Sequence, residues 1–451
     1  MSSSKAQTST QKIPPVRYGE EESEAWRERF PSLTAFYLAA VGSAVGFGNV
    51  WRFPALVKDY GGGTFFIPYI LALVLIGMPI LILEISLGQY YQTSNVGAFG
   101  SFHARYRGVG LSSAVCAYIL VTYYSMLLTW VTHAFFDSFN DSSPWKTQGT
   151  TGQEAIDYFY AEIIGMDTLG EDNRPTRIVS ANVGYAAIVW TVIFLCLGFG
   201  MQWLGRLVYF TMGFPTVLLF IFLGKAVSLE GSEDGIVEYI GRWDISVLTE
   251  SPEVWSTAVS QIFFSLGVTL GTMTVYGSYC PRGEAAVHNS IVIAVSNSMF
   301  SFISGFAVFA ALGHLAYLQG VEVNNLAYSG FSLVFGTWPV VFASFPAGEH
   351  WVRLLFFDLF LLGLDSAFSI LDAPLSVFLD SRFGKVLKKW QAVMVFCVFG
   401  FLCSLLYGKH VTMHIQQLPS TLPLSSKVSH ERTNCFYTFI SRSYRRRLDL
   451  S

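Results

Sequence analysis

The amino-acid sequence predicts an all-α protein that crosses a membrane several times. Of its 451 residues, 52% are hydrophobic and 13% are charged, whereas soluble domains carry about a quarter charged residues. No charged residue occurs between Ile178 and Leu204, and only His288 and His314 interrupt a second uncharged stretch at 285–321. Because about 20 apolar residues span a bilayer, both stretches predict membrane helices.

Nine membrane spans are expected in a membrane domain at 33–408, between a polar tail at 1–32 and a polar, basic segment at 409–451. The apolar runs are 33–57, 63–90, 113–139, 180–200, 205–227, 253–279, 286–312, 352–379 and 389–408. The tail lacks the pattern of a cleavable signal peptide, so the first span is expected to direct insertion.

The distribution of basic residues predicts a cytoplasmic N-terminus. With that orientation the short inner segments hold 13 Lys and Arg, and the longer outer segments hold seven. Such an asymmetry follows the positive-inside rule. Asn140 begins the N-glycosylation sequence Asn140-Asp141-Ser142 on an outer segment. We expect a multi-pass protein of the plasma membrane, glycosylated at Asn140.

Two spans contain residues that interrupt a helix in mid-membrane. The first span has three glycines, Gly42, Gly46 and Gly48, followed by Asn49 and Pro54, and the sixth has glycine, serine and threonine at 265–272. Unwound backbone at that depth is tolerated where it lines a cavity or binds ions, and paired broken helices are typical of secondary transporters. Close packing of small residues is the alternative interpretation of each cluster.

Ionisable and amide side chains inside spans are costly, and they usually have a function. Arg52 could instead reach the outer surface, and Glu84 could be a structural anchor. Asp365 is harder to dismiss, because an acid beside the hydroxyl of Ser366 in mid-span suits a small cation that takes oxygen ligands. Asn49 and Asn297 complete the set of buried polar groups that we single out.

Other functional classes find little support. The net charge of −3 gives no basic surface for a nucleic acid. The sequence holds no nucleophile–base pair, phosphate loop or metal-ligand cluster, which argues against an enzyme. Polar positions form no ring or filter-like run, so a channel is a weaker alternative. The six cysteines are expected to be small buried hydrophobic residues.

Four segments resemble the neurotransmitter:sodium symporter family. They are Gly-Ser-Ala-Val-Gly-Phe-Gly-Asn-Val-Trp-Arg-Phe-Pro (42–54), Gly-Gly-Gly-Thr-Phe (61–65), Gln-Ile-Phe-Phe-Ser-Leu-Gly (261–267) and Gly-Leu-Asp-Ser (363–366). The similarity runs from Arg27 to Tyr407. It implies the bacterial leucine-transporter-like fold, with two inverted five-helix repeats and breaks in helices 1 and 6.

The resemblance implies two sodium sites, a chloride site and a substrate site. The first sodium site would comprise Ala44, Asn49, Ser265 and Asn297, and the second Gly42, Val45, Leu362, Asp365 and Ser366. The chloride site would comprise Tyr69, Gln261, Ser265, Asn297 and Ser301. The substrate would contact Ala44, Gly46, Leu120, Tyr124, Phe264, Gly267, Leu270 and Ser366. Chloride-independent relatives carry an acid where this chain has Ser301, so we expect chloride dependence.

The resemblance also bears on the substrate and the gates. Monoamine carriers have an aspartate where this chain has Gly46, so a solute that brings its own carboxylate is expected, an amino acid or a similar molecule. Arg27 and Asp380 match the intracellular gate, although Phe30 stands where the family usually has tryptophan. Arg52 matches the extracellular gate, whose acid normally comes from the tenth span.

The sequence departs from the family after the ninth span, because the family has twelve. The second repeat is therefore expected to be incomplete, with 409–451 as non-family sequence from a retained intron, a frameshift, a mis-called exon or a short isoform. The paired cysteines of many animal members are absent from 140–179.

The leading prediction is a sodium- and chloride-coupled symporter that works by alternating access with no organic cofactor. The alternative is a non-transporting family member that binds substrate or a full-length partner. The expected partners are a small solute and the lipid bilayer, with self-association possible.

Overall fold

The computed structural model describes residues 27–141, 143–146, 151–165, 179–326, 330 and 332–410. For Lys146 and for residues 407–410 it describes the backbone alone. Most of the predicted polar tail at 1–32 and nearly all of the segment at 409–451 lie outside these ranges.

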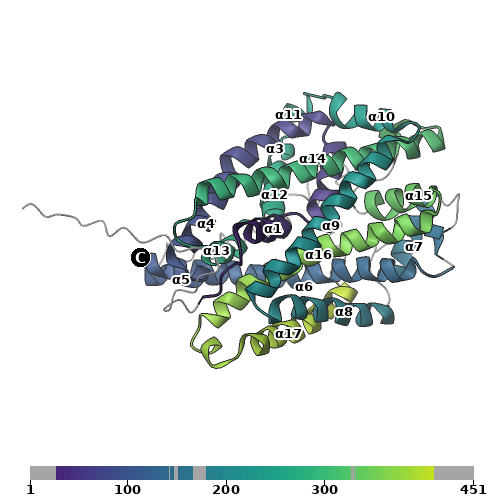
Figure 1. Cartoon of the computed structure of the whole chain (residues 1–451). Coiled ribbons are helices and arrows are strands. Elements are labelled where there is room, and N and C mark those ends of the chain that lie inside the picture. Colours follow the sequence, from purple (N-terminus) through teal and green to yellow (C-terminus); the bar gives the residue numbers. More distant parts are fainter. Residues whose placement is uncertain are drawn as a thin grey trace, which may run out of the picture. The chain divides into compact units, whose positions relative to one another are not determined.

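Seven helices in the described ranges are long and apolar enough to cross a membrane (Figure 1). They match seven of the nine predicted spans, with helix ends that differ from the predicted ends by up to seven residues. The second span is built from α3 (Phe66–Ala72), a π-helical turn (Leu73–Gly77) and α4 (Met78–Tyr91). The other six are α6 (Arg107–Asp137), α8 (Ser180–Gly198), α9 (Met201–Val227), α14 (Ala286–Gln319), α16 (Gly348–Leu379) and α17 (Lys389–His410).

The first predicted span is a bent pair of helices. After α1 (Leu33–Ala44) the backbone is extended at Val45, then continues as a π-helical turn (Gly48–Arg52) and α2 (Phe53–Asp59), with a bend of 55°. At the break, Oδ1 of Asn49 accepts a 2.9 Å hydrogen bond from the amide of Gly46. A side chain thus replaces a carbonyl of the interrupted helix, which satisfies a buried backbone donor.

The sixth predicted span is also divided. It consists of α12 (Glu253–Leu266) and α13 (Thr272–Ser278), each too short to cross a membrane alone. Between them Gly267, Thr269 and Gly271 have positive φ angles of 61°, 72° and 84°. The amide of Thr269 donates to Oε1 of Glu84 at 2.5 Å. Glu84 therefore anchors the unwound segment, as one of its two interpretations predicted.

Helix α1 lies at the centre of the bundle, where it contacts α9, α12, α13, α14 and α16 (Figure 1). Helix α16 is the most enclosed span, with 83% of its apolar window buried. The two helices also contact each other, which brings the break in the first span against the middle of the eighth. This contact positions the candidate site.

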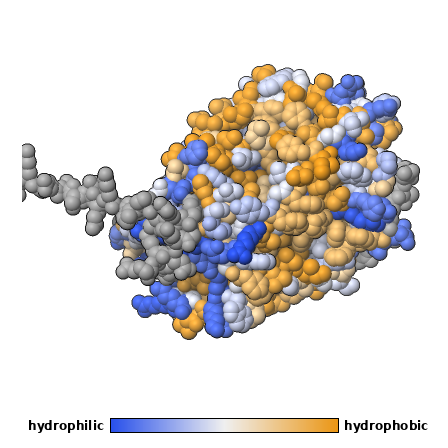
Figure 2. All heavy atoms as spheres, viewed as in Figure 1, coloured by the Kyte–Doolittle hydropathy of each residue, from blue (hydrophilic) through white to orange (hydrophobic). Residues whose placement is uncertain are grey.

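Apolar side chains also cover the middle of the surface shown in Figure 2, and hydrophilic residues gather towards its two ends. Many of the exposed apolar residues lie on spans, for example Leu75 on the second, Val217 on the fifth and Val398 on the ninth. An apolar belt between polar ends is what a bilayer requires.

The segments between spans contain short helices that the sequence pattern did not predict. These short helices are α5 (Asn95–Phe102), α7 (Gly152–Tyr158), α10 (Ser232–Ile236), α11 (Val247–Glu250) and α15 (Trp338–Ala343). The π-helical turns there are Phe159–Ile164, Val237–Gly241 and Leu333–Thr337. The 3₁₀ turns between spans are Ala104–Tyr106, Pro144–Lys146, Val323–Asn325 and Gly384–Val386, and a further 3₁₀ turn, Gly63–Phe65, begins the second span.

Candidate functional site

The five residues predicted for the second sodium site come together where α1 ends. A methyl group at Gly42 would lie 2.7 Å from Oδ2 of Asp365, so the α1 backbone reaches the carboxylate directly. The Ser366 hydroxyl contacts the carbonyl oxygens of Val45 at 3.3 Å and Leu362 at 3.5 Å. Both carboxylate oxygens of Asp365 are buried and lack a hydrogen-bond partner among the described residues. A buried carboxylate without a partner is costly unless a cation or proton neutralises it.

The residues predicted for the first sodium site form one network on the other side of the break. Nδ2 of Asn49 donates to Oδ1 of Asn297 at 2.9 Å and to the hydroxyl of Ser265 at 3.3 Å. Nδ2 of Asn297 donates to the same hydroxyl at 2.8 Å. Ala44, the last residue of α1, is buried at the point where regular helix ends. Two amide oxygens, a hydroxyl and freed backbone carbonyls make a neutral oxygen donor set for a monovalent cation.

The predicted chloride residues occupy neighbouring positions on α3, α12 and α14. They are Tyr69, Gln261, Ser265, Asn297 and Ser301, and all of them are buried. The Tyr69 hydroxyl donates to Ser298 at 3.1 Å, and the hydroxyl of Ser301 accepts from Asn49 at 2.8 Å. Hydroxyl and amide groups can donate to an anion, and no carboxylate belongs to the set.

The predicted substrate residues surround the two breaks. A methyl group at Gly46 would lie 2.6 Å from the Ser366 hydroxyl and 2.9 Å from the Tyr124 hydroxyl, so a larger side chain does not fit there. The Tyr124 hydroxyl is buried without a hydrogen-bond partner in the described part of the chain. No atom lies within 4 Å of a methyl group placed on Gly267. Leu120, one turn before Tyr124, and Leu270 are half-buried. Ala44 is shared with the first sodium set.

The two residues predicted for the inner gate, Arg27 and Asp380, form an ion pair. Nη1 of Arg27 lies 2.8 Å and 3.1 Å from the two carboxylate oxygens of Asp380, and its Nε donates to Ser278 at 2.9 Å. The guanidinium also lies over the ring of Tyr279, 5.1 Å from its centroid. Phe30, the departure from the family pattern, is fully buried against that ring.

The predicted outer gate has a different arrangement. The Arg52 guanidinium lies 5.0 Å from the ring centroid of Phe264 and donates to the hydroxyl of Ser260 at 3.2 Å. No acid pairs with Arg52 within the described ranges. The predicted glycosylation residue, Asn140, is exposed just beyond the end of α6, and its Nδ2 donates to Asp137.

The sequence profile of the sodium:neurotransmitter symporter family matches residues 27–156 and 146–422. The chain belongs to this family. Among curated relatives it is 34% identical to the sodium- and chloride-dependent creatine transporter 1 of Oryctolagus cuniculus, over 87% of this chain and 66% of that protein. It is 33% identical to the Homo sapiens sodium- and chloride-dependent taurine transporter, over 87% of this chain and 67% of that protein. The chain thus spans about two thirds of the length of these symporter relatives.

A further relative in the symporter family is the Mus musculus sodium- and chloride-dependent neutral and basic amino acid transporter B(0+), which is 31% identical over 86% of this chain and 68% of its own length. Among solved structures, MhsT in complex with L-phenylalanine superimposes with a TM-score of 0.71 at 24% identity, covering 89% of this chain and 84% of that chain. The chain therefore has the leucine-transporter-like fold of this symporter family, as the resemblance predicted.

Several partners of the candidate symporter sites were missed by the sequence reasoning. Asp380 also accepts from the Thr93 hydroxyl at 2.9 Å and the Ser94 amide at 2.7 Å. Asp372 accepts from the Tyr279 hydroxyl at 3.0 Å, behind the gate arginine. The sequence spacing could have predicted Asp372 as a neighbour of the site, because it follows Asp365 by seven residues and therefore lies on the same helix face. No comparable sequence spacing indicated that Thr93 and Ser94 contact Asp380.

Proposed function

We propose that this chain is a sodium- and chloride-coupled symporter of a small zwitterionic solute, working by alternating access. The observation that carries the proposal is the burial of the Asp365 carboxylate at the break in the first span. Its two carboxylate oxygens are buried without a hydrogen-bond partner in the described ranges, and they face the α1 backbone where the helix is broken. A sodium ion held there by Asp365, Ser366 and carbonyl oxygens would neutralise that charge, and its release would leave the charge exposed to the low dielectric of the core.

Chloride dependence follows from the neutral donors on α3, α12 and α14. Two cations brought into the core need negative charge nearby, and Asp365 supplies a single unit. The buried set around Ser301 contains hydroxyl and amide groups, which bind an anion but add no fixed charge. A chloride ion bound at Tyr69, Gln261, Ser265, Asn297 and Ser301 would therefore complete the charge balance of the loaded site.

The substrate class follows from the surroundings of Gly46. No carboxylate side chain belongs to the predicted substrate set, and Tyr124 offers a buried hydroxyl without a partner among the described residues. This favours a solute with its own acidic group, which would meet that hydroxyl and the sodium ion of the first site. The names of the relatives include creatine, taurine and amino acids, and all of these solutes carry both an acidic and a basic group. We place such a solute between the breaks of the first and sixth spans.

The same proposal fixes an orientation in the cell. The excess of Lys and Arg on the inner segments and the exposed Asn140 support a plasma-membrane protein with a cytoplasmic N-terminus. The Arg27–Asp380 gate would then close the cytoplasmic side. Self-association remains a separate prediction, to be tested by cross-linking.

Uptake of radiolabelled creatine, taurine and a panel of amino acids by cells expressing the chain tests the proposal. Sodium would be replaced by choline, and chloride by gluconate, in parallel wells. We expect uptake of at least one solute to exceed the uptake by untransfected cells. This uptake should be lost when sodium is replaced and also when chloride is replaced. Uptake that is unchanged by either replacement would refute ion coupling.

Binding without transport is the second candidate, and Arg52 favours it. In the described part of the chain its guanidinium meets a hydroxyl and an aromatic ring, whereas the resemblance implies an acidic partner for outer closure. Sodium-dependent binding of a solute with no uptake in the same cells would support this alternative.

A further inference from the structure

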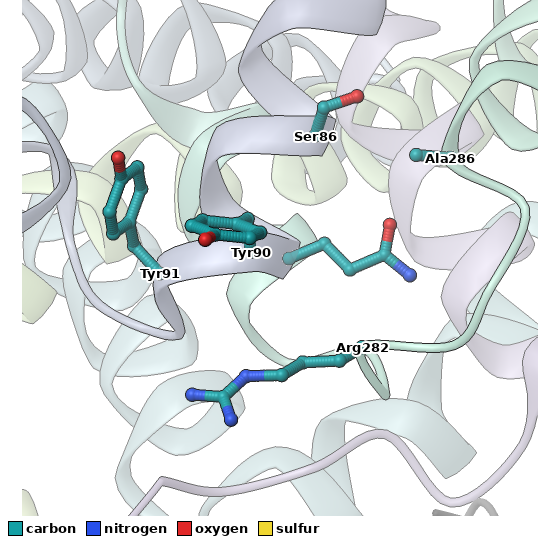
Figure 3. A pocket seen from close by; sticks show the side chains of 6 residues that line it. Ser86, Tyr90, Tyr91, Arg282 and Ala286 are labelled. Carbon is teal, nitrogen blue, oxygen red and sulfur yellow. The ribbon is translucent and has the colours of Figure 1, made fainter. Parts of the chain in front are cut away.

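A pocket outside the ion and substrate sites lies between the end of α4 and the start of α14. Its volume is about 550 Å³, and it is lined by Ser86, Gln89, Tyr90, Tyr91, Arg282 and Ala286. In Figure 3 the ring of Tyr90 lies between Ser86 and the Arg282 side chain, and Ala286 lies at one side. None of the lining residues belongs to the predicted transport machinery, so the pocket needs its own explanation.

The pocket carries an unneutralised positive charge. Arg282 is exposed and forms no hydrogen bond or ion pair with any described residue. Glu284, the acid closest to it in sequence, forms no ion pair with it within the described ranges. The loop that carries Arg282 is fastened to α4, because Nε2 of Gln89 donates to the carbonyls of Pro281 at 2.6 Å and Glu284 at 3.0 Å. The backbone that carries the Arg282 side chain is thus held in place beside the pocket by two hydrogen bonds.

The other polar groups of the pocket also suit an anion. The hydroxyls of Ser86, Tyr90 and Tyr91 make no hydrogen bond to a described residue, so they are available as donors. Helix α14 is 34 residues long, begins at Ala286 in the pocket wall, and has no side-chain cap at that end. Its N-terminus therefore adds partial positive charge to that of the arginine.

The position of the pocket identifies the source of the anion. It lies where two neighbouring spans end, near the Arg27–Asp380 pair: the hydroxyl of Thr93, two residues after α4, donates to Asp380 at 2.9 Å. Tyr90 is 70% exposed, as expected of a tyrosine at the membrane–water interface. Leu83, on the same face of α4 and two turns from Tyr90, is 55% exposed, and Val287 on α14 is 54% exposed. Apolar surface thus continues from the pocket along both helices.

We propose that this pocket binds the headgroup of an anionic phospholipid, with the phosphate at Arg282 and the N-terminus of α14 and the acyl chains along Leu83 and Val287. Basic pockets between membrane helices on the cytoplasmic side recognise such headgroups. Assignment to the inner leaflet rests on the proposed orientation, whereas binding itself depends neither on orientation nor on transport.

The test uses the purified full chain in detergent and short-chain phosphatidylglycerol, with binding followed by native mass spectrometry. Short-chain phosphatidylcholine is the neutral comparison, and inorganic phosphate is the free anion. We expect phosphatidylglycerol to bind at least about fivefold more tightly than either. Equal binding of phosphatidylcholine would overturn recognition of a net negative headgroup. Equal binding of inorganic phosphate would overturn the assignment to a lipid.

Two matched variants separate the pocket from general attraction to a basic surface. Arg282→Gln should lower the affinity for phosphatidylglycerol about fivefold, as expected for one basic residue. Arg382→Gln removes an exposed arginine close to the inner gate but outside the pocket, and it should leave the affinity unchanged. Equal losses in the two variants, or none in Arg282→Gln, would refute the site. Tyr90→Phe keeps the ring at this exposed position, and it should also weaken binding by loss of one donor.

Discussion

At the scale of single residues, the proposed function rests on three positions. In that proposal Asp365 would supply the negative charge, Ser301 would set whether the balancing anion is fixed or mobile, and Gly46 would leave room for the solute. Their contacts are short and local: the backbone of Gly42 lies against the acid, and the methyl group that Gly46 lacks would collide with the hydroxyls of Ser366 and Tyr124. Substitutions at these positions therefore test ion and substrate coupling separately.

Asp365→Asn keeps the size of the side chain and removes its charge. We expect sodium affinity, measured by sodium dependence of solute binding, to fall roughly tenfold or more, because a charge-assisted contact is lost. Asp358→Asn is the matched control, since Asp358 is a buried acid seven residues earlier on the same helix face. It should shift sodium affinity by less than about twofold. Equal effects of the two substitutions would remove Asp365 from the sodium site.

Ser301→Glu places a fixed carboxylate among the neutral donors. Uptake or solute binding should then persist when chloride is replaced by gluconate, because the carboxylate supplies the missing negative charge. Ser301→Gln has the same size without the charge and should stay chloride-dependent or lose activity. A chloride requirement that survives in Ser301→Glu would show that the anion is bound elsewhere.

At the scale of elements, a side chain at each break accepts a hydrogen bond from an amide of the unwound backbone. Asn49 replaces a helix carbonyl in the first span, and Glu84 on α4 accepts from Thr269 in the sixth. The glycines and mid-span polar residues were enough to predict where both helices break. That Thr269, a β-branched residue, takes a positive φ could not be predicted, because tertiary contacts rather than local preference hold it there.

Glu84→Ala removes the acceptor of the Thr269 amide. We expect the free energy of unfolding to fall by roughly 1 kcal/mol, because the Thr269 amide loses its acceptor in a turn that already has a positive φ angle. Thermal unfolding of the purified protein in detergent measures this loss. Glu84→Gln keeps a carbonyl acceptor and should recover most of the stability. If Glu84→Ala unfolds at the same temperature as the parent, the anchor role is wrong.

Arg27→Ala should open the inner gate, because Asp380 then loses its paired cation and Ser278 loses a donor. Reactivity of the buried Cys280 towards a thiol reagent added from the cytoplasmic side should rise roughly tenfold or more. Arg382→Ala, an exposed neighbour of Asp380 in sequence, is the control and should not change the rate. Cys280→Ser identifies the labelled thiol, and unchanged labelling in Arg27→Ala would contradict the gate.

At the scale of the whole molecule, apolar runs predicted the spans well because a bilayer demands about 20 apolar residues from each one. The helices between spans were missed, since α7 and α10 are short, polar and stabilised by contacts that leave little periodicity. Helix α7, for instance, depends on a capping box made by Thr151 and Glu154. Family motifs named the core of the candidate site, but the lipid pocket at Arg282 required the folded arrangement of α4 and α14.

The central claim is that ion gradients drive a solute through this chain. Purified protein in liposomes, given an inward sodium gradient with chloride outside, measures it directly with the solute identified by the uptake panel. The account predicts accumulation above the external concentration, abolished by dissipating the sodium gradient, by replacing chloride and by Asp365→Asn. Accumulation that ignores the sodium gradient, or sodium-dependent binding with no accumulation, would contradict it.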